Sequence, residues 1–358
     1  MNRKMYKIVA LLLLAVVAPQ VAAAESWRIH NDAAKGAHFT SINAAMASEA
    51  VKDGDVIYLD AGCILSDDQT ISKAVTVIGT GWNFTDRPYA AARLAKKLYI
   101  TAQATVSGLY VVGTIYPQCS NVVIERCRID GGVQQRDTKI TAQNVVIRQC
   151  TLNKNIQGAG KTATQTSGWK IYNCQVYESS TNSGAICDLN RVEIVNNLLR
   201  YNYYWNSYSY NVIQNVEDAV IKNNIILHQC NNKEYYKNYV IDDATNLQVY
   251  NNVLSADSTS SSLYAKYPNN VCVGSNVSTD FVVNTGNGGE WMRLSEGSPA
   301  KGAGEGGVDC GPYAEGSLYP FVTYGMPQYV NYPLKASVSA RPTNDQVTVK
   351  LHIVKQQE

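Results

Sequence analysis

The chain repeats one short pattern at nearly regular intervals inside its most hydrophobic runs. The stretches IVNNLLR, IKNNIIL and VYNNVLS each read apolar, any residue, Asn-Asn, apolar, apolar. Their second asparagines are Asn197, Asn224 and Asn252, which lie 27 and 28 residues apart. A fold must place a polar amide repeatedly among apolar residues to accommodate this pattern, so the repeat limits the architecture more than any other feature.

The same column of residues continues in both directions along the chain. Alignment on the second asparagine places Cys127, Cys150 and Cys174 in VVIERCR, VVIRQCT and KIYNCQV, with Leu109 before them and Asn276 at the far end. From Cys127 onward the steps are 23, 24, 23, 27, 28 and 24 residues. Each unit alternates apolar and polar residues as a strand does, and polar segments separate the units.

A period of about 20–30 residues that carries short strands predicts a solenoid. Leucine-rich repeats have this length, but they require a Leu framework and a helical stretch that this chain lacks. A β-sandwich would not keep one residue type in register over successive units. We therefore predict an all-β fold, a right-handed parallel β-helix of about ten coils between Val56 and Val277, each coil adding about 4.8 Å.

Stacked coils explain the asparagines, because the same position of each coil lies above its predecessor. A buried Asn can bond the Asn above, the Asn below and the backbone of the turn. The first Asn of each pair is expected to face outward or to turn the chain, since Asn tolerates left-handed backbone. We predict buried free thiols at Cys127, Cys150 and Cys174, because in-register side chains do not converge as disulfides require.

Both ends of an open β-helix need caps. At the N-terminal end, Thr40 or Ser41 can cap a helix over SINAAMASEA that places Ile42, Ala45, Met46 and Ala50 on one face. At the other end, KASVSA and QVTVKLHIV flank the turn RPTND. This pattern predicts a closing β-hairpin over about residues 335–355.

The first residues have the three parts of a secretory signal: the basic MNRKMYK, the apolar IVALLLLAVVA and the cleavage site Ala22-Ala23-Ala24. We expect residues 1–24 to be a signal peptide, with an uncleaved anchor as the alternative, 25–318 the β-helix with its cap, and 319–358 an extended segment with the hairpin. No later segment is long enough to span a membrane. Removal of three basic residues takes the net charge from +2 to −1, which argues against nucleic acid as a partner.

Two stretches resemble a known family. FTSINAAMASEAVKDGDVIYLDAG followed by ISKAVTVIGTGW resembles the opening of secreted bacterial proteins of the pectin-lyase-like right-handed β-helix superfamily. EGSPAKGAGEGGVDCGPY, from Glu296 to Tyr313, resembles the SPA-x-GAG…D-x-G tail that closes many of them. The resemblance implies the fold and a secreted, periplasmic or cell-surface location in a bacterium. It leaves function open, because the superfamily holds lyases, hydrolases and adhesive proteins.

Lyases of this superfamily need a base and a cation, often calcium, while its hydrolases carry clustered Asp with Gly-His-Gly. The arginine motif of pectate lyases and the Gly-His-Gly stretch are both absent here. An ionisable stripe shortly after the ladder position gives the catalytic candidates Lys154, Glu178, Arg200 and His228. A solvated row of alternating charge is the alternative interpretation.

Acidic residues before the ladder position are the candidates for calcium, the one cofactor that the sequence suggests. They are Asp188, Glu217, Asp242 and Asp243. Ordinary loop acids are the alternative.

Aromatic residues are concentrated in two coils that are longer than their neighbours. YNYYWNSYSY and EYYKNY supply the candidates for glycan contact, since Tyr and Trp faces bind sugar rings; these are Tyr203, Tyr204, Trp205, Tyr235, Tyr236 and Tyr239. Packing inside the solenoid is the alternative for some of them. We expect at least Tyr203, Trp205 and Tyr236 to line a groove, with Arg200 and His228 at its edge.

The sequence thus favours a secreted or surface β-helix protein, monomeric, that recognises a polysaccharide or surface glycan without a clear catalytic constellation. One alternative is a polysaccharide lyase or a glycoside hydrolase acting on an acidic polysaccharide, the lyase being preferred. Another is a structural or adhesive surface protein.

Overall fold

The computed structural model describes residues 24–82, 91–179, 183–203, 211–230, 240–241, 245–255, 266–274, 278–283, 292–322, 332–338 and 349–354. The predicted signal peptide, except Ala24, lies outside these ranges. Within them, no helix is long and apolar enough to cross a membrane.

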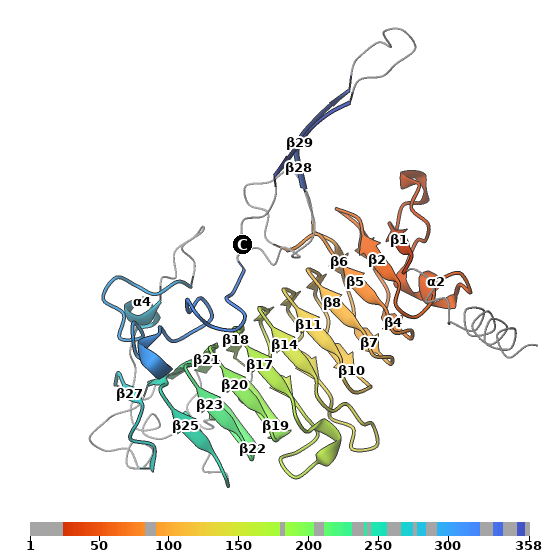
Figure 1. The fold of residues 1–358 in the computed structure, drawn as a ribbon. Helices are drawn as coiled ribbons and strands as arrows, with labels where there is room; N and C mark the ends of the chain where they lie inside the picture. Colours follow the sequence, from red (N-terminus) through yellow and green to blue (C-terminus); the bar gives the residue numbers. More distant parts are fainter. Residues whose placement is uncertain are drawn as a thin grey trace, which may run out of the picture.

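Most of the chain winds through three parallel sheets in turn, as Figure 1 shows. The first sheet contains β1 (Ser26–Ile29), β2 (Val56–Leu59), β5 (Thr76–Ile78), β8 (Thr105–Ser107), β11 (Val123–Glu125), β14 (Val146–Arg148), β17 (Lys170–Tyr172), β20 (Glu193–Val195), β23 (Val220–Lys222) and β25 (Gln248–Tyr250). The second sheet contains β3 (Ile64–Leu65), β6 (Arg93–Leu94), β9 (Tyr110–Val111), β12 (Arg128–Ile129), β15 (Thr151–Leu152), β18 (Gln175–Glu178), β21 (Leu198–Tyr203), β24 (Ile225–Cys230), β26 (Val253–Leu254) and β27 (Val271–Cys272). The third sheet contains β4 (Gln69–Ile71), β7 (Leu98–Ile100), β10 (Ile115–Pro117), β13 (Val133–Gln134), β16 (Ile156–Gln157), β19 (Ile186–Asn190) and β22 (Ile213–Glu217).

Each strand from β2 to β21 pairs with the strand three elements later, so the chain forms a parallel β-helix of about nine to ten coils. This confirms the predicted architecture. Side chains alternate between the interior and the outer face of each sheet, because successive residues of a strand point to opposite sides. In the first sheet, for example, Ile57, Val77, Val106 and Ile124 are all buried in the interior.

The asparagine column is a buried ladder, as predicted. Asn197, Asn224 and Asn252 have no exposed surface. The Nδ2 of Asn197 donates to Oδ1 of Asn224 at 2.9 Å, and the Nδ2 of Asn224 donates to Oδ1 of Asn252 at 2.9 Å. Each Asn backbone N–H also donates to the next side-chain oxygen, so both the amides and the turn backbone are satisfied.

The expected position of the last rung, Asn276, is wrong. Val253 pairs with Val271, so the residue that follows Asn252 in the column is Asn270. Its Oδ1 accepts from both the backbone N–H and the Nδ2 of Asn252 at 2.9 Å. The last step, from Asn252 to Asn270, is therefore 18 residues long. Among the described residues of this step there is no strand of the first sheet, whose last strand is β25.

The sulfur-containing part of the column is also as predicted. Cys127, Cys150 and Cys174 are buried free thiols. The sulfurs occupy the slot of the amides: the Sγ of Cys150 accepts from the backbone N–H of Cys127 at 3.4 Å and donates to the carbonyl of Ile124 at 3.6 Å. Burial raises the pKa of the Cys127 and Cys150 thiols well above the usual range.

The residue before each rung turns the chain from the first sheet to the second. Asn196, Asn223 and Asn251 have φ values of 56°, 57° and 55°, in the left-handed region that Asn tolerates better than most residues. Asn173 and Gln149 hold the same conformation one and two coils earlier, with φ of 50° and 55°. The predicted role of the first Asn in turning the chain is confirmed.

The N-terminal cap is a short helix, α2 (Ile42–Ala47). Ser41 rather than Thr40 is its N-cap, and its Oγ accepts from the backbone N–H of Ala44 at 3.0 Å. Ile42, Ala45 and Met46 are buried as predicted. Ala50 is exposed, because the helix ends at Ala47.

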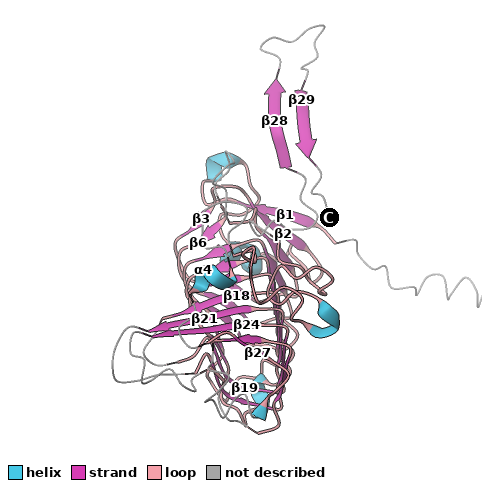
Figure 2. Ribbon diagram, turned by 90° about the vertical axis from the view of Figure 1, so that its left-hand side faces the viewer, coloured by secondary structure: helices cyan, strands magenta, loops and turns pink. Residues whose placement is uncertain are grey.

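Beyond the last coil the chain contains α4 (Thr279–Val282) and then a segment, residues 292–322, that folds back along the solenoid. Other short helical turns are η1 (Ala33–Lys35), η2 (Thr164–Thr166) and η4 (Glu305–Gly307). The returning segment covers the outer face of the second sheet near its C-terminal end, where Leu198, Ile225 and Val253 pack against Met292 and Cys310. Figure 2 shows β18, β21, β24 and β27 beside α4.

The predicted C-terminal hairpin is present. β28 (Tyr332–Val338) and β29 (Val349–Val354) pair antiparallel with a register shift between Pro333 and Lys335. They form a separate two-stranded sheet that, in the described chain, shares no ladder with the three sheets of the solenoid. The strand pairing therefore does not show the hairpin closing the end of the solenoid, as the sequence predicted.

Candidate functional site

The four catalytic candidates do not form a single stripe. Glu178 pairs in register with Tyr201, and Tyr201 with His228. Arg200 lies one position earlier, beside Tyr177, and its side chain therefore points to the opposite face of the sheet. The alternation of side chains along a strand divides the candidates between the interior and the surface.

His228 belongs to the interior. Its side chain is 2% exposed and stacks on the buried ring of Tyr201, with ring centroids 5.4 Å apart. Its backbone N–H donates to the Oγ of Ser255 at 2.6 Å. His228 therefore lies inside the solenoid rather than at the edge of a groove.

Lys154 and Glu178 meet where the chain leaves the second sheet for the third. The Nζ of Lys154 lies 3.4 Å from Oε1 of Glu178, and their side chains are 42% and 1% exposed. The other carboxylate oxygen of Glu178 accepts from the backbone N–H of Asn155 at 2.9 Å. A buried carboxylate thus has both a cation and backbone donors, as a buried charge requires.

A chain of amides connects this pair to Asp188. The Nδ2 of Asn155 donates to Oε1 of Gln157 at 3.3 Å, and the Nε2 of Gln157 donates to Oδ2 of Asp188 at 2.6 Å. Asn215 donates from its Nδ2 to the other oxygen of Asp188. The structure therefore joins Lys154, Glu178 and Asp188 in one network across successive coils.

The calcium candidates do not converge in the described part of the chain. Asp188 accepts from the side chain of Asn215, whereas Glu217 pairs with Asn190 and accepts from the Oγ1 of Thr245 at 2.8 Å. Asp242 and Asp243 lie outside the described residues. Among those described, no group of three or more His, Cys, Asp or Glu could hold a metal ion.

The aromatic candidates fall almost wholly outside the described residues. Tyr204, Trp205, Tyr235, Tyr236 and Tyr239 lie in ranges that the structure does not describe. Of Tyr203 only the backbone is placed, as the last residue of β21 beside Cys230. Their predicted contact with a glycan stays a prediction.

A groove of about 330 Å³ lies on the outer face of the second sheet over β15, β18 and β21. It was not predicted from the sequence. Its lining combines polar and apolar side chains with one aromatic ring, and the returning C-terminal segment supplies one wall through Met292. The lining residues are Thr151, Leu152, Asn153, Gln175, Val176, Tyr177, Leu198, Arg200 and Met292. Asn153 is the chain neighbour of Lys154, but neither Lys154 nor Glu178 is among the residues that line the groove.

Gln175 is the most informative residue of the groove. Its side chain is 5% exposed, and its Oε1 accepts from the Oγ1 of Thr151 at 3.3 Å. Its Nε2 is buried and has no hydrogen-bond partner in the described protein. Because an unsatisfied buried donor costs free energy, this amide is a candidate position for an acceptor that the described residues do not supply.

Arg200 lies beside this amide and is held over an aromatic ring. Its guanidinium carbon is 5.2 Å from the centroid of the Tyr177 ring, a cation–π arrangement that fixes the side chain. In the sequence, Gln175 and Arg200 could be recognised only by their position in β18 and β21, where every second side chain points outward. Which positions point outward can be assigned only when the strand register is known.

The same outer face continues toward the N-terminal coils. Asp130 accepts from the Oη of Tyr110 at 2.7 Å, the Nε of Arg128 at 3.1 Å and the Nδ2 of Asn153 at 2.7 Å. Burial raises the pKa of the Tyr110 hydroxyl, and its hydrogen bond to Asp130 adds to this shift. Arg128 and Arg93 both lie over the Tyr110 ring, with guanidinium carbons 4.8 and 5.6 Å from its centroid.

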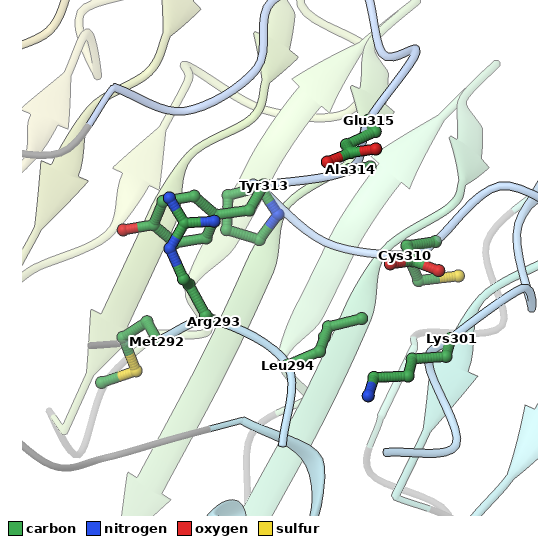
Figure 3. Close-up of a pocket in the computed structure, with 10 residues that line it drawn as sticks. Met292, Arg293, Leu294, Lys301, Cys310, Tyr313, Ala314 and Glu315 are labelled. Carbon is green, nitrogen blue, oxygen red and sulfur yellow. The ribbon is translucent and has the colours of Figure 1, made fainter. Parts of the chain in front are cut away.

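A second cavity of about 210 Å³ lies within the returning segment, on the other side of Met292. Figure 3 shows its lining, in which the guanidinium of Arg293 lies over the ring of Tyr313 at 4.6 Å. Lys301 points toward the same space but donates to the carbonyl of Glu296 at 2.6 Å. Met292 has a φ of 61°, an uncommon conformation for a residue other than Gly.

Comparison with protein-family models, with curated proteins and with solved structures finds no match to this chain. The parallel β-helix is therefore established by its own strand pairing, and the family remains a matter of the sequence resemblance.

Proposed function

We propose that this protein binds a glycan in the groove on the outer face of the second sheet. The observation that carries the proposal is the buried Nε2 of Gln175, which faces the groove without a partner in the described protein. Sugars offer hydroxyl, ring and carboxylate oxygens at high density, and these are the acceptors that an amide donor and a guanidinium need.

The surroundings of Gln175 suit such a ligand. Arg200, held on Tyr177, presents N–H donors beside the amide, and Asn153 and Thr151 add polar groups along the floor. Open grooves with a few placed polar groups and an apolar wall, here Leu198 and Met292, are typical of ligand sites. The aromatic residues of the two longer coils would extend the contact with sugar rings.

The resemblance of the N-terminal and tail stretches supports a secreted bacterial protein of the pectin-lyase-like superfamily that acts at the cell surface or beyond it. The mature net charge of −1 favours a glycan over nucleic acid as the partner. We propose that the protein acts as a monomer.

A second candidate function, a polysaccharide lyase, is favoured by Lys154. Its side chain is 42% exposed, the residue follows Asn153 of the groove in the chain, and its ammonium group is paired with a buried carboxylate. Once it has lost a proton, the amine at this position could remove the proton next to a sugar carboxylate. The preference for binding over catalysis rests on Gln175, whose unpartnered donor lies in the groove, whereas Lys154 is not among the residues that line it.

A panel of neutral and uronate polysaccharides would test both functions. Binding is measured by affinity electrophoresis for the wild type and for Gln175→Glu, which keeps the acceptor for Thr151 but replaces the free donor by a carboxylate. We expect the wild type to bind at least one polysaccharide and Gln175→Glu to lose about tenfold or more in affinity.

Lys170→Gln is the matched control, because Lys170 lies on the first sheet, is 46% exposed and pairs only loosely with Glu193 at 3.6 Å. Equal binding by wild type and Gln175→Glu would refute the groove as the site. A rise in ultraviolet absorbance from unsaturated products, abolished in Lys154→Ala, would establish the lyase instead.

A further inference from the structure

The carboxylate of Asp55 is buried at the N-terminal end of the solenoid and accepts three hydrogen bonds. Asp55 directly precedes β2 and is 3% exposed. Its Oδ1 accepts from the backbone N–H of Glu25 at 2.8 Å, and its Oδ2 accepts from the backbone N–H of Lys52 and from Nε1 of Trp27, both at 2.8 Å. All three donors are neutral groups, whereas a buried charge is costly unless it is also paired with an opposite charge.

In the described part of the chain, no cation forms an ion pair with Asp55. Lys52 belongs to the same turn, but its side chain is exposed. The other charged groups of the turn are engaged elsewhere: Asp53 accepts from a backbone N–H at 2.8 Å, and the Nζ of Lys73 donates to the carbonyl of Val51 at 2.8 Å. The described residues therefore give this buried carboxylate hydrogen bonds without a cationic partner.

Glu25 is held in place through both of its backbone groups. Its carbonyl accepts from the backbone N–H of Val56 at 2.9 Å, which continues the parallel ladder in which Ser26 of β1 pairs with Val56 of β2. The nitrogen of Glu25 is thereby fixed against Oδ1 of Asp55. Ala24 and Glu25 are both exposed, so the peptide bond that joins them lies at the surface beside a buried carboxylate.

The nitrogen that Asp55 binds is the one that removal of the predicted signal peptide would free. The motif Ala22-Ala23-Ala24 predicts cleavage between Ala24 and Glu25. One water molecule adds across that peptide bond: Ala24 departs with the leader as a carboxylate, and the nitrogen of Glu25 becomes an amine that takes up the released proton. Because the usual pKa of an α-amine is about 7.7–8.0, this group is mostly an ammonium at neutral pH.

Resting on the predicted signal peptide, we propose that cleavage at this bond is a maturation step in which the new α-ammonium group of Glu25 forms an ion pair with Asp55 and fixes β1 on β2. The neutral N–H of the precursor becomes a charged donor at the same place, and charge-assisted hydrogen bonds are about twice as strong as neutral ones. The strand register requires the mature chain to begin at Glu25. A start at Ala24 moves the amine about 3.8 Å along the chain, and a start at Ser26 removes the donor.

The first test determines where the secreted protein begins and how its terminal amine ionises. The full-length chain is secreted from a bacterial host, and mass spectrometry identifies its first residue, which we expect to be Glu25. The pH dependence of acetylation of the α-amine then gives its pKa. We expect this pKa to be raised above the usual range, because the buried carboxylate favours the charged form. Asp55→Asn returns the pKa to that range, whereas Asp60→Asn, which removes a carboxylate bound to Arg28 at the same end of the solenoid, leaves it unchanged.

The second test keeps Asp55 and changes only the terminus, so it does not depend on the folding of Asp55→Asn. A chain that begins at Ala22 retains the N–H of Glu25 but carries its terminal charge three residues away. At neutral pH the chain that begins at Glu25 should melt about 2 °C or more higher. Since folding raises the pKa of the amine, this difference is full below the unfolded pKa of about 7.7–8.0 and is lost as the pH rises through the folded pKa.

Four results would contradict the inference. A secreted protein that keeps its leader or begins at another residue lacks the charged donor. An amine with an ordinary pKa shows that no ion pair forms, and so do equal melting temperatures for the chains that begin at Ala22 and Glu25. A raised amine pKa that persists in Asp55→Asn assigns the effect to another partner. None of these measurements involves a glycan, so this inference and the proposed function can fail independently.

Discussion

The asparagine ladder makes a quantitative prediction about Asn224, whose amide is shared among neighbours on both sides. Its Nδ2 donates to the carbonyls of Ile194 at 2.8 Å and Lys222 at 2.9 Å and to Oδ1 of Asn252. Its Oδ1 accepts from the backbone N–H of Asn197 at 2.8 Å and from the Nδ2 of Asn197. Replacing Asn224 by Leu removes all five hydrogen bonds while keeping the side chain close in volume.

The cost follows from the groups that are left without a partner. The Nδ2 of Asn197 keeps the carbonyl of Ile171 at 2.9 Å, and Oδ1 of Asn252 keeps the backbone N–H of residue 224. The backbone N–H of Asn197 and the carbonyl of Ile194 lose their side-chain partner, at roughly 1–3 kcal/mol for each buried group. Allowing about 1 kcal/mol for the added apolar surface of Leu, Asn224→Leu destabilises the protein by about 3 kcal/mol.

The comparison with Asn224→Cys distinguishes the ladder from simple packing. Cys already fills this column at Cys127, Cys150 and Cys174, and the sulfur of Cys150 accepts from a backbone N–H and donates to a carbonyl. The ladder therefore predicts that Cys costs less than Leu, although Leu buries more apolar surface. Chemical denaturation of the three proteins, followed by circular dichroism, gives the order of stability. A Leu variant as stable as the wild type, or more stable than the Cys variant, would refute the reasoning.

Two further predictions concern ionisation and reactivity. The carboxylate of Asp55 accepts from the backbone N–H groups of Lys52 and Glu25 and from Nε1 of Trp27. Burial raises the pKa of Asp55, but these hydrogen bonds outweigh that effect, so its pKa in the folded protein is lowered. Ionised Asp55 therefore stabilises the fold above the unfolded pKa of about 3.9, and this stabilisation is lost as the pH falls through the lower pKa of the folded state. Asp55→Asn should therefore flatten the acid limb of a pH–stability curve measured by thermal unfolding, and an unaltered limb would contradict the assignment. Cys127 and Cys150 should resist alkylation in the native protein and react only on unfolding, whereas the half-buried Cys119 should react in the native protein. Peptide mapping by mass spectrometry measures the three rates. Labelling of native Cys150 at the rate of Cys119 would contradict the buried column.

The fold could be predicted because its strongest signal is local and repeated. The residue type that recurs at one position of each coil indicates the length of the coils, the interior column and the sharp turn before it. All three are present in the structure. The last rung was misplaced because the expected spacing of 24 residues was extended to Asn276, although the final coil is shorter. The stretch NNV at residues 269–271 repeats the NNV at 251–253, and this signal identifies Asn270 without the structure.

The groove could not be predicted in the same way, because its walls come from distant parts of the chain. Gln175 and Arg200 lie on neighbouring coils, but Met292 reaches them only through a segment that returns after the solenoid is complete. The stripe of charges failed as a guide for a different reason. Counting three or four residues past the ladder mixes the two parities of a strand, so it groups the outward Arg200 with the inward His228.

The paired asparagines have a consequence beyond the interior. The second Asn of each pair forms hydrogen bonds between neighbouring coils. The residue before it, in the left-handed conformation, places its side chain and backbone on the outside of the turn between the first and second sheets. The returning segment is held there: Gln149 donates to the carbonyl of Pro320 at 2.6 Å, Asn173 donates to the carbonyl of Pro312 at 2.9 Å, and the Oδ1 of Asn223 accepts from the backbone N–H of Glu305 at 2.9 Å. This segment carries Met292 to the wall of the groove, so the corner amides that turn the chain also anchor one side of the proposed binding site.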